Sequence, residues 1–265
     1  MPWRWDPTLY EGSAAYYQRG RMPYPQALAD ALCDELALDG TGRLLDVGCG
    51  PGKLTDVLAP LFAEVIGIDA DAAMVAEATR HAPPHATFRQ LRGEELPADL
   101  GAFDVIAFAQ SFHWMDQMRV AATVHSMLRA DGAFVTVGAM THQGEGNVPR
   151  AAIKELVESY LGPGRRAGQS TVSDEGPPWN ATEALDAAGF GPPIEIPVPA
   201  GQMYERSEDD IVASVFSQSS SAPHLFGARL GEFESDMRAL LRSHIPADGY
   251  RERLRDEALL IRRRD

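Results

Sequence analysis

Residues 44–55, Leu-Leu-Asp-Val-Gly-Cys-Gly-Pro-Gly-Lys-Leu-Thr, constrain the fold of this chain more than any other stretch. A short apolar run enters a turn that contains Gly48, Gly50 and Gly52, and a segment with helical periodicity leaves it. Glycine adopts positive φ and lets a ligand lie against bare backbone, and the start of a helix offers unpaired N–H groups. Asp46 precedes the turn, and no phosphate-facing lysine closes it. The pattern therefore indicates a nucleoside ligand whose other end is an amino acid rather than a phosphate chain.

Strand and helix patterns alternate along the first half of the chain. Apolar runs that are typical of buried strands lie at residues 44–47, 65–68, 86–90, 103–109 and 133–138. Between them, apolar residues recur at helical spacing, as in residues 54–61 and 120–128. This alternation predicts an α/β fold with a doubly wound parallel sheet, in which ligands bind at the carboxyl ends of the strands.

Asp69 ends the second expected strand and follows the glycine turn. In doubly wound folds an acidic residue about 20 positions after such a turn binds the ribose diol of a nucleoside. Asp71 is expected to cap the helix that comes next.

The two ends of the chain have a different character. Residues 1–24 are rich in aromatic residues and arginine, and we expect a helix that docks on the core through Trp5, Tyr10 and Tyr17. Beyond residue 140 we expect helices at 151–161, 181–188, 207–215 and 230–241, strands at 194–198 and 258–261, and a loop at 162–178. We predict one domain over residues 1–265, in which 1–24 is an N-terminal lid, 25–140 is a cofactor-binding core and 141–250 is a substrate cap interleaved with the last strands.

Composition excludes several classes of function. The formal net charge is −14, from 24 Lys and Arg against 38 Asp and Glu, whereas nucleic-acid binding needs clustered basic residues. Cys33 and Cys49 lack metal-ligand spacing and fit a reducing compartment. There is no apolar run of membrane-spanning length and no signal-peptide pattern at the N-terminus. We therefore expect a cytoplasmic protein with no metal site and no nucleic-acid or membrane partner; its oligomeric state stays open.

Five segments in order resemble the class I S-adenosylmethionine-dependent methyltransferases: residues 45–52, 67–69, 94–97, 103–105 and 127–133. More narrowly, the chain is similar to the small-molecule group called type 11, which includes the trans-aconitate and ubiquinone/menaquinone methyltransferases. The resemblance is dense from about residue 17 to residue 139. It implies a Rossmann-like seven-stranded, mostly parallel sheet with a C-terminal antiparallel strand, and here we also expect a helical cap. It implies S-adenosyl-L-methionine as cofactor, S-adenosyl-L-homocysteine as product, and direct in-line methyl transfer to a small-molecule acceptor.

The resemblance assigns roles to residues of the turn and of the second strand. Gly48 and Gly50 would lie against the amino-acid moiety of the cofactor, and Asp46 would hold its ammonium group directly or through water. Asp69 would accept hydrogen bonds from the ribose hydroxyls.

The resemblance also assigns residues to the adenine and to the reactive end of the cofactor. Gly93 and Glu94 fall where relatives contact adenine, although Arg92 stands where relatives have Asp. Gln110 follows the fourth strand and would line the cofactor near its reactive end.

Tyr17 and Arg21 precede a Pro-Tyr-Pro segment in a pattern similar to the family's N-terminal region, from which they would reach the cofactor carboxylate. His113 is the best-placed candidate for a general base, and its alternative role is hydrogen-bonded packing. His142 and His224 are further candidates for the acceptor pocket.

Two other nucleotide-binding patterns fit less well. An NAD-dependent dehydrogenase needs G-x-G-x-x-G, but Lys53 stands where the pattern would continue after Gly52. A P-loop needs Gly-Lys-Ser/Thr, but Leu54 follows the lysine. A protein that binds the same cofactor for regulation or for another reaction stays open as an alternative, because no unmistakable base is present.

Overall fold

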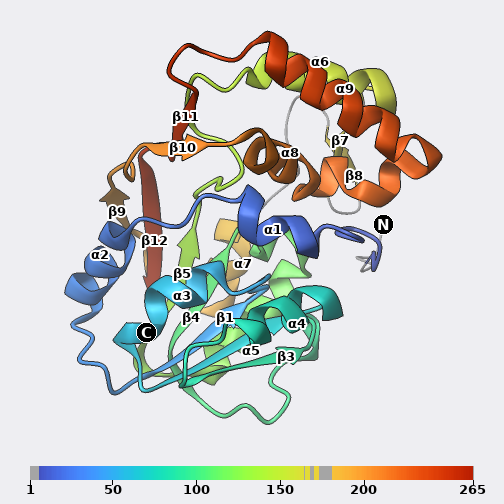
Figure 1. The fold of residues 1–265 in the computed structure, drawn as a ribbon. Coiled ribbons are helices and arrows are strands. Elements are labelled where there is room, and N and C mark those ends of the chain that lie inside the picture. Colours follow the sequence, from blue (N-terminus) through green and yellow to red (C-terminus); the bar gives the residue numbers. More distant parts are fainter. Residues whose placement is uncertain (1–5, 164, 168–169, 173–180, 265) are drawn as a thin grey trace.

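The computed structural model describes residues 6–163, 165–167, 170–172 and 181–264. Its main sheet has seven strands in the order β3-β2-β1-β4-β5-β12-β9 (Figure 1). Strands β1 to β5 pair in parallel, and β12 pairs antiparallel with both β5 and β9. The bounds are β1 (Arg43–Val47), β2 (Glu64–Asp69), β3 (Ala86–Gln90), β4 (Phe103–Ala109), β5 (Leu128–Val137), β9 (Ile194–Val198) and β12 (Glu257–Arg263). The predicted fold class, a mostly parallel seven-stranded sheet with an antiparallel C-terminal strand, is confirmed.

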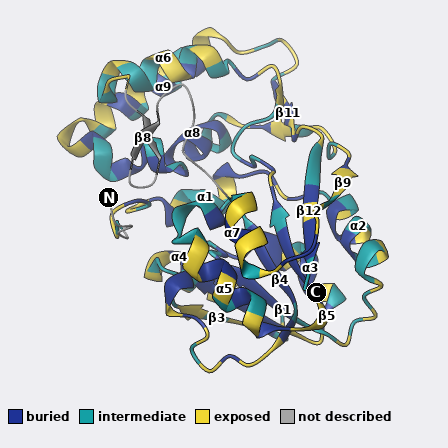
Figure 2. Ribbon diagram, turned by 180° about the vertical axis from the view of Figure 1, so that it is seen from behind, coloured by how far each residue is buried: buried dark blue, intermediate teal, exposed yellow. Residues whose placement is uncertain are grey.

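Two layers of helices cover the sheet, because successive residues of each strand point to opposite faces. On one face, Leu44 packs with α2 (Gln26–Leu36) and α3 (Lys53–Leu58). On the other face, Leu45 packs with α5 (Gln117–Met127) and α7 (Ala181–Ala188). Figure 2 shows the strands buried between these helices. Helix α4 (Ala72–Arg80) packs near β2 and β3, and Asp71 caps it as predicted by accepting hydrogen bonds from the N–H groups of Ala73 and Met74.

Strand β5 begins earlier than the sequence predicts. We expected a strand from residue 133, but β5 extends back to Leu128 and includes Asp131 at φ 63°. The register with β4 shifts there, so that the intervening residues bulge outward. Arg129 stabilises this bulge through an ion pair with Asp104 at 2.8 Å.

Three helices form a cap with its own apolar core: α6 (Arg150–Leu161), α8 (Glu208–Phe216) and α9 (Leu230–Ser243). In that core the ring of Phe226 stacks on Phe233 with 4.1 Å between centroids. Figure 1 shows the cap beyond the carboxyl ends of the parallel strands, with α1 (Ala14–Gly20) between cap and sheet. The division into lid, core and cap segments stays a prediction.

The remaining described elements are short. They are the strands β6 (Glu145–Gly146), β7 (Arg165–Ala167), β8 (Ser170–Val172), β10 (Tyr204–Arg206) and β11 (Tyr250–Arg253), and the 3₁₀ turns at Ala59–Leu61, Gly93–Glu95, Phe112–Trp114, Ser219–Ser221 and Pro223–Arg229. Trp5 and part of the loop predicted at 162–178 lie outside the described residues. No helix in the described part of the chain is long and apolar enough to cross a membrane.

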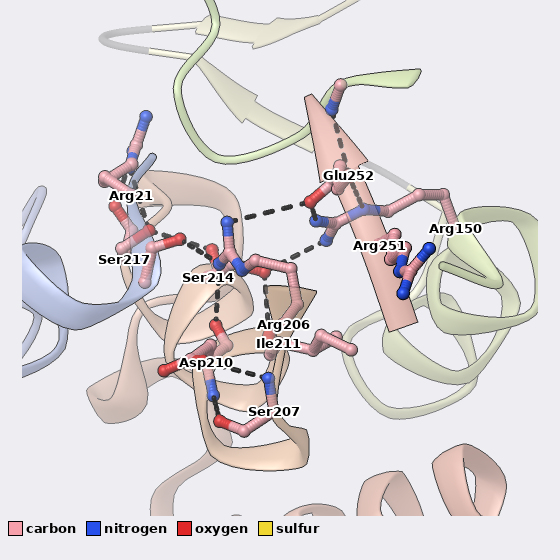
Figure 3. Close-up of polar contacts among 12 residues, drawn as sticks. Arg21, Arg150, Arg206, Ser207, Asp210, Ile211, Ser214, Ser217, Arg251 and Glu252 are labelled. Atoms are coloured by element: carbon pink, nitrogen blue, oxygen red, sulfur yellow. Dashed lines mark hydrogen bonds and ion pairs between the residues drawn. The ribbon is translucent and has the colours of Figure 1, made fainter. Parts of the chain in front are cut away.

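A buried polar network ties the cap to α1 and to β11 (Figure 3). Glu252 is 1% exposed and forms an ion pair with Arg150 at 2.6 Å, while Arg206 lies 3.8 Å away. Arg206 also donates to the carbonyl oxygen of Gly20 at 2.7 Å, and Arg150 donates to the hydroxyl of Ser214 at 3.0 Å. The network therefore joins α6, β11, α8 and the end of α1 around one carboxylate.

Candidate active site

A cleft of about 740 Å³ opens at the carboxyl ends of β1, β2 and β4. Seven of the ten predicted site residues line it: Tyr17, Gly48, Gly50, Asp69, Gly93, Glu94 and Gln110. The tertiary structure thus brings together residues from five separate segments, as the parallel topology predicts.

The glycine turn forms the floor of the cleft with bare backbone. Gly48 and Gly50 have φ angles of 70° and 54°, which side chains other than glycine rarely adopt. A Cβ atom on Gly48 would lie 2.5 Å from the Cβ of Ser111. The turn therefore needs glycine both for its conformation and for close contact.

Asp69 closes the turn from the end of β2. Its Oδ2 accepts a hydrogen bond from the N–H of Gly50 at 2.9 Å, and its Oδ1 accepts one from the N–H of Asp71 at 2.8 Å. Burial raises the pKa of Asp69 to about 6. Each oxygen retains acceptor capacity toward the cleft, because a carboxylate offers about four lone-pair sites.

Asp46 lies beneath the turn and does not line the cleft. The carboxyl group is fully buried, and its Oδ2 accepts a hydrogen bond from the hydroxyl of Thr55 at 2.7 Å. Its Oδ1 has no hydrogen-bond partner among the described residues. Burial raises the pKa of Asp46 to about 7. An orphaned buried oxygen next to a backbone cradle fits a ligand with a cationic amino-acid end.

Gly93 and Glu94 form one wall of the cleft. A Cβ atom on Gly93 would lie 2.6 Å from the sulfur of Met115, so the glycine lets this apolar side chain approach. The Glu94 carboxylate is 6% exposed and accepts a hydrogen bond from the N–H of Asp116 at 2.9 Å. Glu94 therefore anchors the loop between β4 and α5 as well as lining the cleft.

Gln110 stands where the cleft meets a second cavity of about 970 Å³, because Gln110 and Ser111 line both. The backbone of Gln110 has φ 53°, and its side-chain amide donates a hydrogen bond to the carbonyl oxygen of Gly138. Ser111 is buried and donates from its hydroxyl to the carbonyl oxygen of Val47.

The structure separates the predicted pair Tyr17 and Arg21. Tyr17 lines the cleft, whereas the guanidinium of Arg21 lies 4.4 Å from the centre of the Tyr17 ring, and the residue does not line the cleft. Arg21 donates from Nε to the hydroxyl of Ser217 at 2.9 Å and from Nη2 to the Ser217 carbonyl oxygen at 2.7 Å, and its Nη1 lies 2.9 Å from Nδ1 of His142. Arg21 thus holds α1 against the cap.

His113 lines the second cavity and not the cleft. Burial lowers the pKa of His113 to about 4, so its imidazole is neutral at pH 7. Its ring lies 4.7 Å from that of Trp114, which does line the cleft. Neither His142 nor His224 lines either cavity; His224 contacts the carbonyl oxygen of Glu11 at 3.0 Å.

Several cleft residues were not predicted to bind a ligand. Tyr10 and Trp114 form an aromatic wall with 6.2 Å between ring centroids, and Ser111 and Met115 lie nearby in the lining. The N-terminal aromatic content signalled Tyr10, which we assigned to docking on the core. Ser111, Trp114 and Met115 could have been predicted only from their position directly after the fourth strand, at the edge of the sheet where ligands bind.

Comparison with known proteins agrees with this geometry. The family model described as "Methyltransferase domain" matches residues 44–132. An uncharacterized methyltransferase of Schizosaccharomyces pombe is 30% identical over 194 residues, which are 67% of this chain and 70% of that protein. The Saccharomyces cerevisiae protein named "Probable S-adenosylmethionine-dependent methyltransferase CRG1" is 34% identical over 128 residues, 46% of this chain and 43% of that protein. The chain spans about half the length of several such curated relatives.

A solved structure from Anaeromyxobacter dehalogenans, described as a type II methyltransferase, has the same fold. It superposes with a TM-score of 0.55 at 21% identity and covers 92% of this chain and 97% of that one. The family match decides against the NAD-dependent alternative, while the type 11 subgroup stays a prediction. The chain belongs to the class I S-adenosylmethionine-dependent methyltransferases.

Proposed function

We propose that the protein transfers the methyl group of S-adenosylmethionine to a small-molecule acceptor by direct in-line displacement. The observation that carries this proposal is the cleft itself: a bare glycine turn closed by Asp69, which opens at Gln110 into a second cavity. One cavity suits a nucleoside with an amino-acid end, and the other is available to a second reactant.

In this proposal the cofactor lies along the floor of the cleft. The backbone of Gly48 and Gly50 contacts its amino-acid moiety, and the orphaned oxygen of Asp46 attracts its ammonium group from beneath the turn. The free lone pairs of Asp69 accept hydrogen bonds from the ribose hydroxyls.

The two walls of the cleft complete the proposed cofactor site. Gly93 and Glu94 face the adenine, next to the apolar Met115. Tyr17 covers the opposite side, where Arg21 supports its ring from behind. Arg21 therefore acts on the cofactor through Tyr17, because hydrogen bonds to Ser217 and a contact with His142 already engage its guanidinium.

Methyl transfer depends mainly on alignment of the acceptor atom with the methyl group and the sulfur of the cofactor. The cofactor supplies a methyl group on a sulfonium that leaves as a neutral thioether. Orientation of two reactants lowers a barrier by as much as ~7–11 kcal/mol, whereas a general base contributes about 10²–10⁴-fold and only where the nucleophile loses a proton. With a pKa of about 4, His113 is a weak proton acceptor. Positioning of the acceptor at Gln110 is therefore the main contribution of this chain.

Calorimetry and an acceptor screen test the proposal. We expect S-adenosylmethionine and S-adenosylhomocysteine to bind in the micromolar range and NAD not to bind. Phenol, amine and carboxylate acceptors are then screened by release of S-adenosylhomocysteine. Failure of S-adenosylhomocysteine to bind would refute the cofactor site, and binding without turnover of any acceptor class would favour the regulatory alternative.

A further inference from the structure

The second cavity lies against the main sheet. Its floor includes Phe108, Thr136, Leu260 and Glu195, which pair directly with one another across β4, β5, β12 and β9. Leu260 is 42% exposed although its strand is in the interior of the sheet. The floor of the cavity thus offers an accessible apolar side chain on which the apolar part of a ligand can pack.

Glu257 lines the second cavity next to Gly138. Its Oε2 would be 3.4 Å from a Cβ atom built on Gly138, whose carbonyl oxygen accepts the hydrogen bond from Gln110. The Glu257 carboxylate is partly buried and has no hydrogen bond or ion pair with any described residue. Its charge is therefore available to a cationic ligand, which would form an ion pair with it at the edge of the cavity.

The cavity has a negative electrostatic character. Among the described residues, its lining contains Glu195 and Glu257 but neither lysine nor arginine. Arg262, further along the same face of β12, is neutralised by an ion pair with Asp186. His113 adds no positive charge at pH 7, because burial lowers its pKa to about 4. Such a field attracts an amine and repels a carboxylate.

We infer that this cavity is the methyl-acceptor site and that it takes a small apolar amine, with the apolar part on Leu260 and the nitrogen between Glu257 and Gln110. The inference rests on the proposed function and adds the class of acceptor. A neutral aliphatic or aromatic body matches the exposed sheet floor, and the nitrogen matches the unpaired carboxylate.

The transfer step balances for an amine without a catalytic base. The bound ammonium first gives a proton to solvent water. The nitrogen lone pair then forms the new C–N bond, the C–S bond breaks, and its electron pair leaves with sulfur. The product is a methylated ammonium ion beside Glu257. A hydroxyl acceptor, in contrast, would need a base, and His113 is a weak one.

Binding of a matched pair of probes to the full chain loaded with S-adenosylhomocysteine tests the inference. The probes are 2-phenylethylamine and 3-phenylpropanoate, which share an aromatic body and differ in charge. We expect calorimetry to show the amine bound about tenfold more tightly, and Glu257→Gln to lower its affinity about tenfold, the size of one hydrogen bond to a charged group. Mass spectrometry of turnover mixtures should show N-methylated amine.

Glu205→Gln is the matched control, because Glu205 is an exposed carboxylate on β10 that pairs with Arg251 at 3.6 Å and lies outside both cavities. It should leave both affinities unchanged, and Glu257→Gln should leave S-adenosylhomocysteine binding unchanged. The inference is overturned when the amine does not bind, when the carboxylate binds as tightly, or when Glu257→Gln binds the amine like the wild type. Failure of the proposed function is distinct: the wild type would then bind no S-adenosylhomocysteine.

Discussion

Replacing Asp69 by asparagine tests how the cleft holds a nucleoside. The carboxylate uses one lone pair on each oxygen for the N–H groups of Gly50 and Asp71, which leaves one acceptor position on each oxygen toward the cleft. Asparagine keeps nearly the same shape but replaces one oxygen by an NH₂ donor and removes the charge. One of the two proposed hydrogen bonds from the ribose is therefore lost.

The expected loss of affinity follows from the cost of that bond. A hydrogen bond to a charged group contributes about 1.5–3 kcal/mol, and each ~1.4 kcal/mol is a factor of ten in affinity. Asp69→Asn should therefore weaken S-adenosylhomocysteine binding by roughly 10- to 150-fold, measured by calorimetry. Thermal unfolding without ligand should show that the variant is folded, because one of its two backbone hydrogen bonds can be kept.

Asp39→Asn is the control for this experiment. Asp39 is an exposed carboxylate that also accepts a backbone hydrogen bond, from Thr41 at 3.0 Å, and it does not line the cleft. The affinity of the Asp39→Asn variant for S-adenosylhomocysteine should equal that of the wild type. A folded Asp69→Asn protein that binds as tightly as the wild type would refute the assignment of Asp69 to the ribose.

Three further predictions concern stability. Glu252→Gln removes the buried counter-charge of Arg150 and should lower the free energy of unfolding in urea by about 3–5 kcal/mol; a variant as stable as the wild type would contradict this. Gly20→Ala places a Cβ against the backbone of α8 and should lower the free energy of unfolding by about 1–3 kcal/mol. Gly231→Ala in α9 has open space around it and should raise the free energy of unfolding by about 1 kcal/mol. Equal effects of the two substitutions would contradict the close contact of α1 and α8. Burial raises the pKa of Asp46 from 3.8 to about 7, so the folded protein keeps a proton that the unfolded chain loses. Asp46 should therefore contribute a fall of about 3 kcal/mol in the free energy of unfolding of the ligand-free protein as pH rises from about 4 to 7. Because burial also raises the pKa of Asp69 to about 6, Asp46→Asn should make the total decrease smaller by this amount rather than abolish it.

The sequence by itself determined the fold class and most of the proposed cofactor site. Periodicity identifies buried strands, glycines at close spacing require a turn with positive φ, and an acid after the second strand must lie near that turn. Asp69 and Gly50 meet for this reason, since parallel strands end at the same edge of a sheet. These patterns are local in the sequence, and the parallel α/β topology alone brings them together. They can therefore be interpreted without knowledge of distant contacts.

Only the tertiary structure decided which groups remain available for function. Nothing in the sequence around Arg21 shows that Ser217, almost 200 positions away, engages its guanidinium, and nothing around His113 shows that burial lowers its pKa. Glu257 lies beside Gly138 only because β12 inserts antiparallel beside β5, while Gln110 reaches Gly138 from the end of β4. The second cavity depends on the packing of segments that share no local motif. Burial and pairing across such distances set the charge and exposure of a side chain, and therefore the acceptor that this protein is expected to take.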